Sequence, residues 1–218
     1  MNTPFIRNHH YNLIIKQVEL LQQACATVSD KRVVESVRYS AQSNILEALP
    51  NASELHQQLL NQLSGLHTAE QFQHYLQSLE PYRTGFPQVT GKQVAKLFPK
   101  VKKMKLPDLA AIDYRNVTYL GWLDVGTGRM FLIYHLDDQF VGLEGRFTPS
   151  RKGVCFLCNR HEELALFTAV TKVKPANASP DYYKAIGNYL CVDSEACNRN
   201  IRDVTVLENY VRAVTGLV

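Results

Sequence analysis

The first 80 positions of the chain contain apolar residues that recur every three or four residues, which is the period of an amphipathic helix. The clearest stripe covers positions 11–28, and glutamine, lysine and glutamate lie between its apolar members. A second stripe follows Asp30, and two more follow Ser53 and Thr68, all of which are residue types that cap helix N-termini. Four amphipathic segments joined by short turns predict an antiparallel helical bundle.

The helical period ends near "LEPYRTGFPQVTG", which crowds prolines and glycines into positions 79–91. Thr90 predicts the cap of a short helix. Three strand-like runs come next, "VTYLGWL", "RMFLIYHL" and "FVGLEGRF", and pieces of hairpin length separate them, which predicts an antiparallel meander. The strand-like runs "LALFTAVTKV" and "GNYLC" then precede a run of helical period, "DVTVLENYVRAV". We therefore predict an α+β protein with an antiparallel helical bundle domain at 1–82 and an α/β domain at 83–218.

Charge is distributed unevenly between these two parts. Residues 1–80 carry 5 basic and 7 acidic residues, a net of −2, which leaves 19 basic and 13 acidic residues, a net of +6, for residues 81–218. A basic cluster in "PKVKKMKLP" comprises Lys100, Lys102, Lys103 and Lys105. This cluster is either a solvated face or a contact for RNA or for an acidic protein surface.

No apolar run approaches the roughly 20 residues of a membrane-spanning helix, and the N-terminus lacks the pattern of a signal peptide. We therefore expect a cytoplasmic protein that makes no contact with a membrane. Because thiols stay reduced in the cytosol, paired cysteines in such a protein favour a metal site over disulfides.

Four of the five cysteines follow the spacing C-x2-C-x32-C-x5-C, and they are Cys155, Cys158, Cys191 and Cys197. The first pair lies in a tight turn, and the second pair spans a strand end and a helix that Ser194 could begin, which is the arrangement of a treble-clef-like zinc finger. Four thiolates fill the tetrahedral coordination of one zinc ion, so we expect a single structural ion. The alternatives are buried free thiols without a metal, or His161 as a ligand. The fifth cysteine, Cys25, lies on an apolar stripe and is expected in the core.

The remaining residues show no recognisable pair of nucleophile and base. The adjacent acidic residues at 137–138 and 162–163 are expected in turns, and the histidines lack the spacing of a metal-binding helix. We therefore expect that the protein is not an enzyme. A metal-dependent hydrolase, which requires an open position on the zinc ion, is the weakest of the alternatives.

The segments "KVKKMKLP", "GWL", "GVCFLCN" and "YLCVDSEACNRNIRD" resemble the FusB-type family of fusidic acid resistance and elongation factor G-binding proteins. The resemblance implies a helical bundle followed by a domain with a four-cysteine zinc finger. It further implies that the zinc-bearing domain binds elongation factor G and promotes its release from ribosomes on which fusidic acid has locked it. The drug itself is neither bound nor destroyed in that scheme. The protein would act as a monomer on or near the ribosome.

Residues around the zinc finger are candidates for the surface that binds elongation factor G. Phe156 lies inside the first knuckle and is either an aromatic anchor or a packing contact for the last helix. Lys184 lies between Tyr183 and Tyr189, a mixture favoured at interfaces, although a solvated loop edge also accounts for it. In the C-terminal helix, Leu207 and Tyr210 are apolar and face either the core or the partner.

Two hypotheses from different classes follow from the sequence. The first is a module that binds a translation factor. The second is a zinc-finger RNA-binding protein, which the lysine cluster and the basic C-terminal half favour; that cluster could also contact ribosomal RNA in the first hypothesis.

Overall fold

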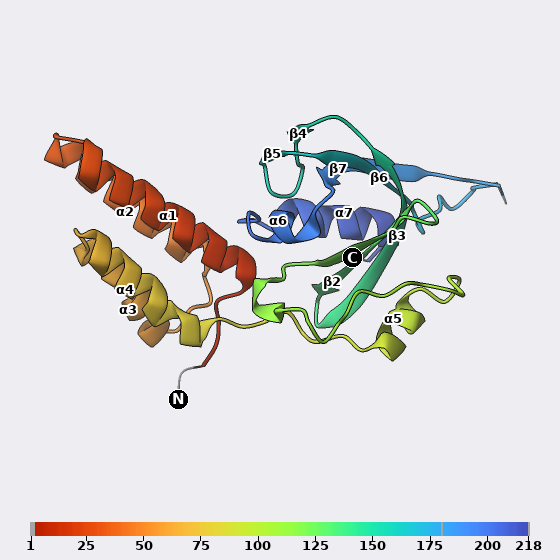
Figure 1. Cartoon of the computed structure of the whole chain (residues 1–218), viewed down its shortest axis with the longest axis horizontal. Coiled ribbons are helices and arrows are strands. Elements are labelled where there is room, and N and C mark those ends of the chain that lie inside the picture. Colours follow the sequence, from red (N-terminus) through yellow and green to blue (C-terminus); the bar gives the residue numbers. More distant parts are fainter. Residues whose placement is uncertain (1–2, 180, 218) are drawn as a thin grey trace. The chain divides into compact units, whose positions relative to one another are not determined.

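The chain folds into two compact units that divide after Thr84, and the computed structural model describes residues 3–179 and 181–217 (Figure 1). The boundary predicted from composition, between residues 82 and 83, lies two positions before this division. Among the residues that the structure describes, no helix combines the length and the apolar character needed to cross a membrane.

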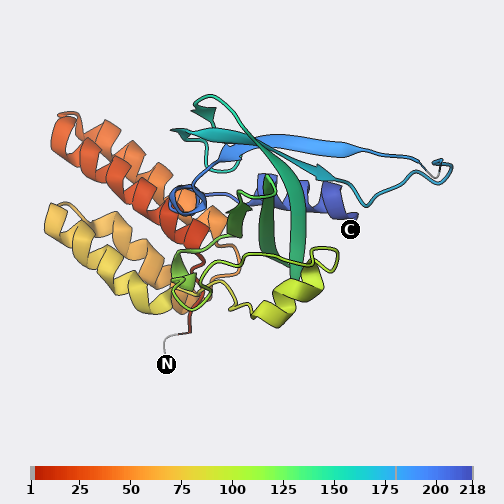
Figure 2. The same ribbon diagram turned by 45° about the vertical axis from the view of Figure 1, so that its right-hand side comes forward.

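The first unit is helical. Its elements are α1 (Asn8–Thr27), α2 (Lys31–Ala48), α3 (Glu54–Asn61) and α4 (Ala69–Leu79), with 3-10 turns η1 (Gln62–Gly65) and η2 (Glu80–Tyr82). Helix α1 runs beside α2, and α3 runs beside α4, as both views show (Figure 1, Figure 2). The side chains of Asp30, Ser53 and Thr68 accept hydrogen bonds from backbone N–H groups of the first turns of α2, α3 and α4. These contacts confirm the predicted helical domain and its caps.

A buried arginine joins α2 to η1. The Nη1 of Arg38 donates to the backbone carbonyls of Leu63, at 3.3 Å, and Leu66, at 2.7 Å, and its Nε lies 3.4 Å from the carboxylate of Glu35. The Leu63 carbonyl also accepts from the backbone N–H of Leu66 at 3.3 Å, so the guanidinium adds a second donor there and bonds the carbonyl of Leu66, which follows the turn. Arg38 is 5% exposed and therefore serves the packing of this unit.

The second unit is built on one five-stranded sheet. Its strands are β1 (Leu120–Asp124), β2 (Arg129–Leu136), β3 (Gln139–Pro149), β6 (Leu164–Val170) and β7 (Ala185–Cys191), in the spatial order β1-β2-β3-β6-β7. Every pairing is antiparallel, which confirms the predicted meander of the first three strands. Asp137 and Asp138 form the β2–β3 turn with φ of 48° and 59°, the conformation of a tight hairpin turn that aspartate tolerates.

Helices cover the two faces of this sheet. The sheet curls around α7 (Thr205–Thr215), while α5 (Gly91–Leu97) lies against the outer side of β2 and β3 (Figure 2). Alternation along β2 explains this: Leu132 belongs to the core under α7, and Phe131 and Ile133 belong to the core under α5. The short helix α6 (Ser194–Asn198), the two-stranded ribbon of β4 (Gly153–Val154) and β5 (His161–Glu162), and the 3-10 turn η3 (Tyr114–Asn116) complete the unit.

Candidate metal centre

The first cysteine pair lies in the tight turn between β4 and β5. The backbone N–H of Cys155 donates to the carbonyl of Arg160 at 2.9 Å, and the N–H of Asn159 donates back to the carbonyl of Cys155 at 3.0 Å. Asn159 has a φ of 55°, in the left-handed region that asparagine adopts more readily than most residues. This reversal of the chain turns both Cys155 and Cys158 toward the same point.

The second cysteine pair comes from the end of β7 and from α6. Cys191 closes β7 opposite Leu164, and the chain then turns into α6, which carries Cys197 in its first turns. The helix begins at Ser194 as predicted, and its cap is Asp193, whose Oδ1 accepts from the second and third N–H groups of the helix at 2.8 Å and 3.0 Å. The Ser194 hydroxyl instead donates to the carbonyl of Gly121, at 2.8 Å, and ties α6 to β1.

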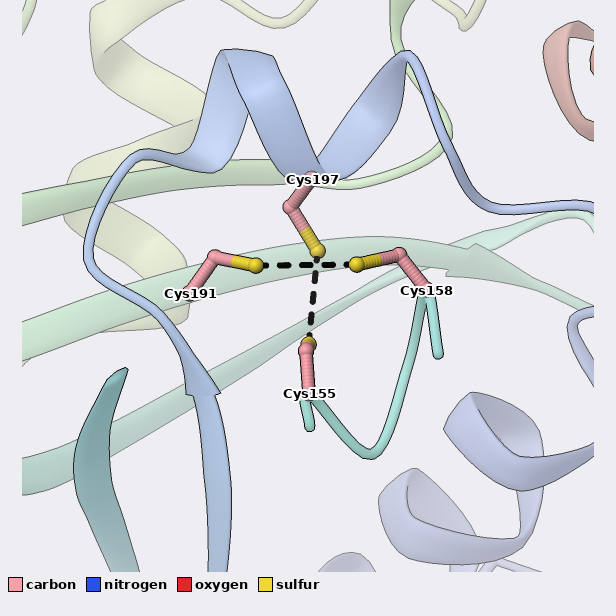
Figure 3. Close-up of side chains that lie close together, drawn as sticks. All are labelled: Cys155, Cys158, Cys191 and Cys197. Carbon is pink, nitrogen blue, oxygen red and sulfur yellow. Dashed lines mark hydrogen bonds between the residues drawn. The ribbon is translucent and has the colours of Figure 1, made fainter. Parts of the chain in front are cut away.

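The four sulfur atoms converge on one point, as Figure 3 shows. All four lie within 4.8 Å of one another, with Cys155 and Cys197 at 3.8 Å and Cys158 and Cys191 at 3.6 Å. A tetrahedral zinc site with Zn–S bonds of about 2.3 Å places its sulfurs about 3.8 Å apart. Donor type, donor number and spacing therefore fit a zinc ion, and free thiols packed only as apolar groups would not need this geometry.

The mutual proximity of the four thiols perturbs their ionisation. Hydrogen bonding with the neighbouring thiols, Cys158 foremost, lowers the pKa of Cys155. Hydrogen bonding to Cys155 raises the pKa of Cys191 and the pKa of Cys197. The protein alone therefore does not hold four negative charges here, whereas a dication at the centre compensates them.

The alternative ligand and the fifth cysteine lie apart from this cluster. His161 is exposed on β5 and does not belong to the group of converging side chains. Cys25 is on α1 in the helical unit, where it is partly buried beside the core rather than inside it as predicted.

A buried asparagine holds the segment before β1 against the metal-site helix. The Oδ1 of Asn198 accepts from the backbone N–H groups of Thr118, at 2.7 Å, and Tyr119, at 3.1 Å. Its Nδ2 donates to the carbonyls of Tyr119 and Ser194, both at 2.9 Å. Sequence reasoning did not single out Asn198, because its bonding partners in the segment before β1 lie 79 and 80 positions away.

The candidate residues for partner binding divide into exposed and buried ones. Tyr183 and Tyr189 are 69% and 48% exposed, and Lys184 is exposed next to Tyr183, before β7 begins. Phe156 is half-buried, and its ring packs edge-on against the Tyr210 ring at a centroid distance of 5.6 Å, which is the packing alternative for this residue.

The prediction for the C-terminal helix requires a correction. Leu207 is fully buried and Tyr210 is 4% exposed, and both belong to the core that the sheet forms with α7. These two side chains are therefore unavailable to a partner in this fold. Their apolar stripe is covered by the curled sheet.

The basic cluster borders a groove that sequence reasoning missed. Its lysines, at positions 100, 102, 103 and 105, are all exposed, and Lys100 lines an open groove of about 1010 Å³ over the outer face of β3 and β6. Arg129, Arg146 and Lys172 line the same groove, together with one acidic residue, Glu144, which pairs with Arg129. Alternating polar residues on β3 and β6 predict that one face of these strands is exposed to solvent. They do not predict which part of that face the neighbouring helices leave uncovered.

Comparisons with known proteins agree with this architecture. A family model described as "Elongation factor G-binding protein, N-terminal" matches residues 5–87. A second, described as "FBP C-terminal treble-clef zinc-finger", matches residues 97–214. Among solved structures, that of the fusidic acid resistance protein FusC is similar, with a TM-score of 0.77 and 28% sequence identity over 98% of each chain. A search of curated protein sequences found no significant match.

Proposed function

Because the chain belongs to the FusB-type family of elongation factor G-binding proteins, we propose that it binds elongation factor G and releases it from the ribosome. In doing so it would protect translation from fusidic acid by acting on the drug's target. The observation that carries the proposal is the similarity to FusC along 98% of both chains, which includes the zinc-finger domain. Such a role requires a cytoplasmic protein and needs one copy of the chain.

One structural zinc ion is part of the proposal. Cys155, Cys158, Cys191 and Cys197 would hold it, and when bound it supplies rigidity, because four thiolates leave no open position for water or substrate. The cysteines come from the β4–β5 turn, the end of β7 and the following helix α6, so their convergence joins two parts of the chain that are distant in sequence. A domain held in this way presents one rigid face without any chemical step, which is why we propose no enzymatic activity.

The exposed residues beside the knuckle are the proposed contact for elongation factor G. The backbone N–H of Phe156 donates to the carbonyl of Tyr189 at 2.9 Å, which places the exposed Tyr189 beside the zinc knuckle, whereas Tyr183 and Lys184 are exposed where β7 begins. Exposed tyrosines next to a lysine give apolar area and charge with few rotatable bonds to immobilise. A protein that binds the released factor more tightly than the ribosome-bound factor favours release by that difference in affinity.

The test is binding to purified elongation factor G, followed by release from ribosomes. We expect a complex at micromolar concentrations by titration calorimetry, and a faster departure of labelled factor from ribosomes that fusidic acid has stalled. Tyr189→Ala combined with Lys184→Ala should weaken the complex at least tenfold. Tyr39→Ala is the matched control, because it removes a tyrosine that is 75% exposed on the helical unit. Absence of a micromolar complex with the wild-type protein would refute the proposal.

RNA binding is the second candidate function, and the basic groove is the observation that favours it. The lining contains four cationic side chains, including Lys100 and Arg146, and one carboxylate, so the groove attracts a phosphate chain. If the groove binds RNA, affinity for single-stranded RNA should fall steeply as salt rises, and a double Lys100→Ala, Arg146→Ala variant should reduce that slope by about 1.4. Binding to elongation factor G that tolerates salt and needs no RNA would count against this function.

A further inference from the structure

Tyr119, in the segment just before β1, carries a buried hydroxyl that the fold does not explain. The residue is fully buried, and its hydroxyl oxygen has no hydrogen-bond partner among the residues that the structure describes. Buried hydroxyl groups are nearly always bonded, because a group that leaves water without a new partner weakens the fold. We therefore expect the Tyr119 hydroxyl to have a hydrogen-bond acceptor in the metal-loaded protein.

The ring of Tyr119 is held in place from two sides. Its backbone N–H and carbonyl are both bonded to the side chain of Asn198, the residue that follows Cys197. On the other side, Gly121 makes room for the ring: a Cβ built at that glycine would lie 2.6 Å from Cε2 of Tyr119. A side chain fixed at both its backbone and its ring edge has little freedom to turn its hydroxyl elsewhere.

Tyr119 is bonded through its backbone to α6, the helix that carries Cys197. Tyr119 belongs to the same buried cluster as the four cysteines. Burial raises the pKa of Tyr119 well above its usual value, and the nearby Cys197 raises it further. A tyrosine hydroxyl is protonated at neutral pH and can act as a donor.

We infer that the Tyr119 hydroxyl donates a hydrogen bond to the sulfur of Cys197 in the zinc-loaded protein, as a positioning residue for the metal centre. The inference rests on the zinc site of the proposed function. A zinc ion with four thiolates carries a net charge of −2, and the buried sulfurs need N–H or O–H donors to share it. The backbone N–H of Leu157 already donates to the sulfur of Cys155 at 3.4 Å, and the Tyr119 hydroxyl would donate to the sulfur of Cys197.

Tyr119→Phe tests the inference, because it removes one oxygen and keeps the ring. We expect zinc affinity, measured by competition with a chelator on the full chain, to fall 10- to 100-fold. We also expect acid to release the metal at a higher pH, since a thiolate that has lost its donor takes up a proton more easily. In the cobalt-substituted protein, the sulfur-to-metal charge-transfer bands should move to lower energy, because the sulfur becomes richer in electrons.

Tyr210→Phe is the matched control. It removes another buried hydroxyl of the same unit, one that donates to the carbonyl of Ile186 at 3.1 Å and not to a sulfur. This variant should lose stability while it keeps the zinc affinity and the cobalt spectrum of the wild-type protein. If Tyr119→Phe retains wild-type zinc affinity, or if both variants weaken zinc equally, the inference is wrong.

A second measurement does not depend on whether the variant folds. In wild-type protein loaded with NMR-active cadmium, the Tyr119 hydroxyl proton should exchange slowly and show coupling to the metal through the sulfur. A hydroxyl proton that exchanges at the solvent rate would overturn the inference. All of these measurements use the purified protein without elongation factor G, so their failure is distinct from a failure to bind that partner.

Discussion

Replacing Asn198 by alanine should destabilise the C-terminal unit far more than an ordinary substitution of one polar residue. The side chain is 5% exposed and makes four hydrogen bonds, two as acceptor and two as donor. Alanine fits the helix but leaves no group that can reach the segment at Thr118 and Tyr119. The link between that segment and α6 is lost, together with the support it gives to the position of Cys197.

The magnitude follows from the number of bonds. Each neutral hydrogen bond contributes about 1 kcal/mol net to the free energy of unfolding, so the loss of four amounts to about 4 kcal/mol. Asn200→Ala is the internal comparison: its Nδ2 makes one bond, to the carbonyl of Ala196 at 2.8 Å, from two positions further along the chain. That variant should lose about 1 kcal/mol. The expected gap between the two variants is therefore about 3 kcal/mol.

Urea unfolding in excess zinc measures this gap. The single tryptophan of the chain, Trp122, lies on β1 and stacks on Phe131 at a centroid distance of 5.3 Å, so its fluorescence reports on the C-terminal unit alone. The slope of the unfolding free energy against urea should stay the same, with only the midpoint displaced. If Asn198→Ala and Asn200→Ala differ by less than about 1 kcal/mol, the side chain does not bridge the two segments as argued.

Three further predictions concern the metal site and the helical unit. Cys155→Ser should lose its bound zinc and its cooperative unfolding, whereas Cys25→Ser should keep one zinc ion per chain, as measured by metal analysis. One zinc ion per chain in Cys155→Ser would refute the four-thiolate site. Arg38→Met should destabilise the helical unit by about 3 kcal/mol in circular dichroism melts, because the carbonyls of Leu63 and Leu66 lose a charged donor. A change below about 0.5 kcal/mol would contradict this role. Burial, helped by the charge of Arg7, lowers the pKa of His10 from 6.5 to about 4, so the unfolded state binds the proton first as pH falls. Stability should drop between pH 6.5 and about 4, by up to about 3 kcal/mol, and His10→Gln should remove that part of the slope.

Much of the fold could be predicted from local patterns in the sequence. The helices of the first unit follow from apolar residues at helical spacing and from capping residues such as Asp30 and Thr68, whose bonds reach only two or three positions. The β2–β3 hairpin follows from strand-like runs flanking the turn at 137–138. These features involve neighbours in the chain, so the sequence contains the whole interaction.

The metal centre was predicted in the same way, and the partner surface was not. Two cysteines with two residues between them can bind one ion from a single tight turn, and a second pair near a strand end and a helix start completes the donor set. The helical period of α7 places Leu207 and Tyr210 on one apolar stripe, but the period does not predict whether the core or a partner covers that stripe. Here the curled sheet covers it, so these residues belong to the core.

By itself, the sequence determined the helices of the first unit, the long strands of the sheet and the spacing of the four cysteines, because spacing and caps act over a few residues. Only the tertiary structure decided which surfaces stay open. It also decided that Asn198 reaches back 79 positions to hold Tyr119, and that the Tyr119 hydroxyl is buried in the same cluster as the cysteines. The physical reason is that burial and long-range hydrogen bonding depend on how the strands and helices close around a common core, and no local pattern contains that closure.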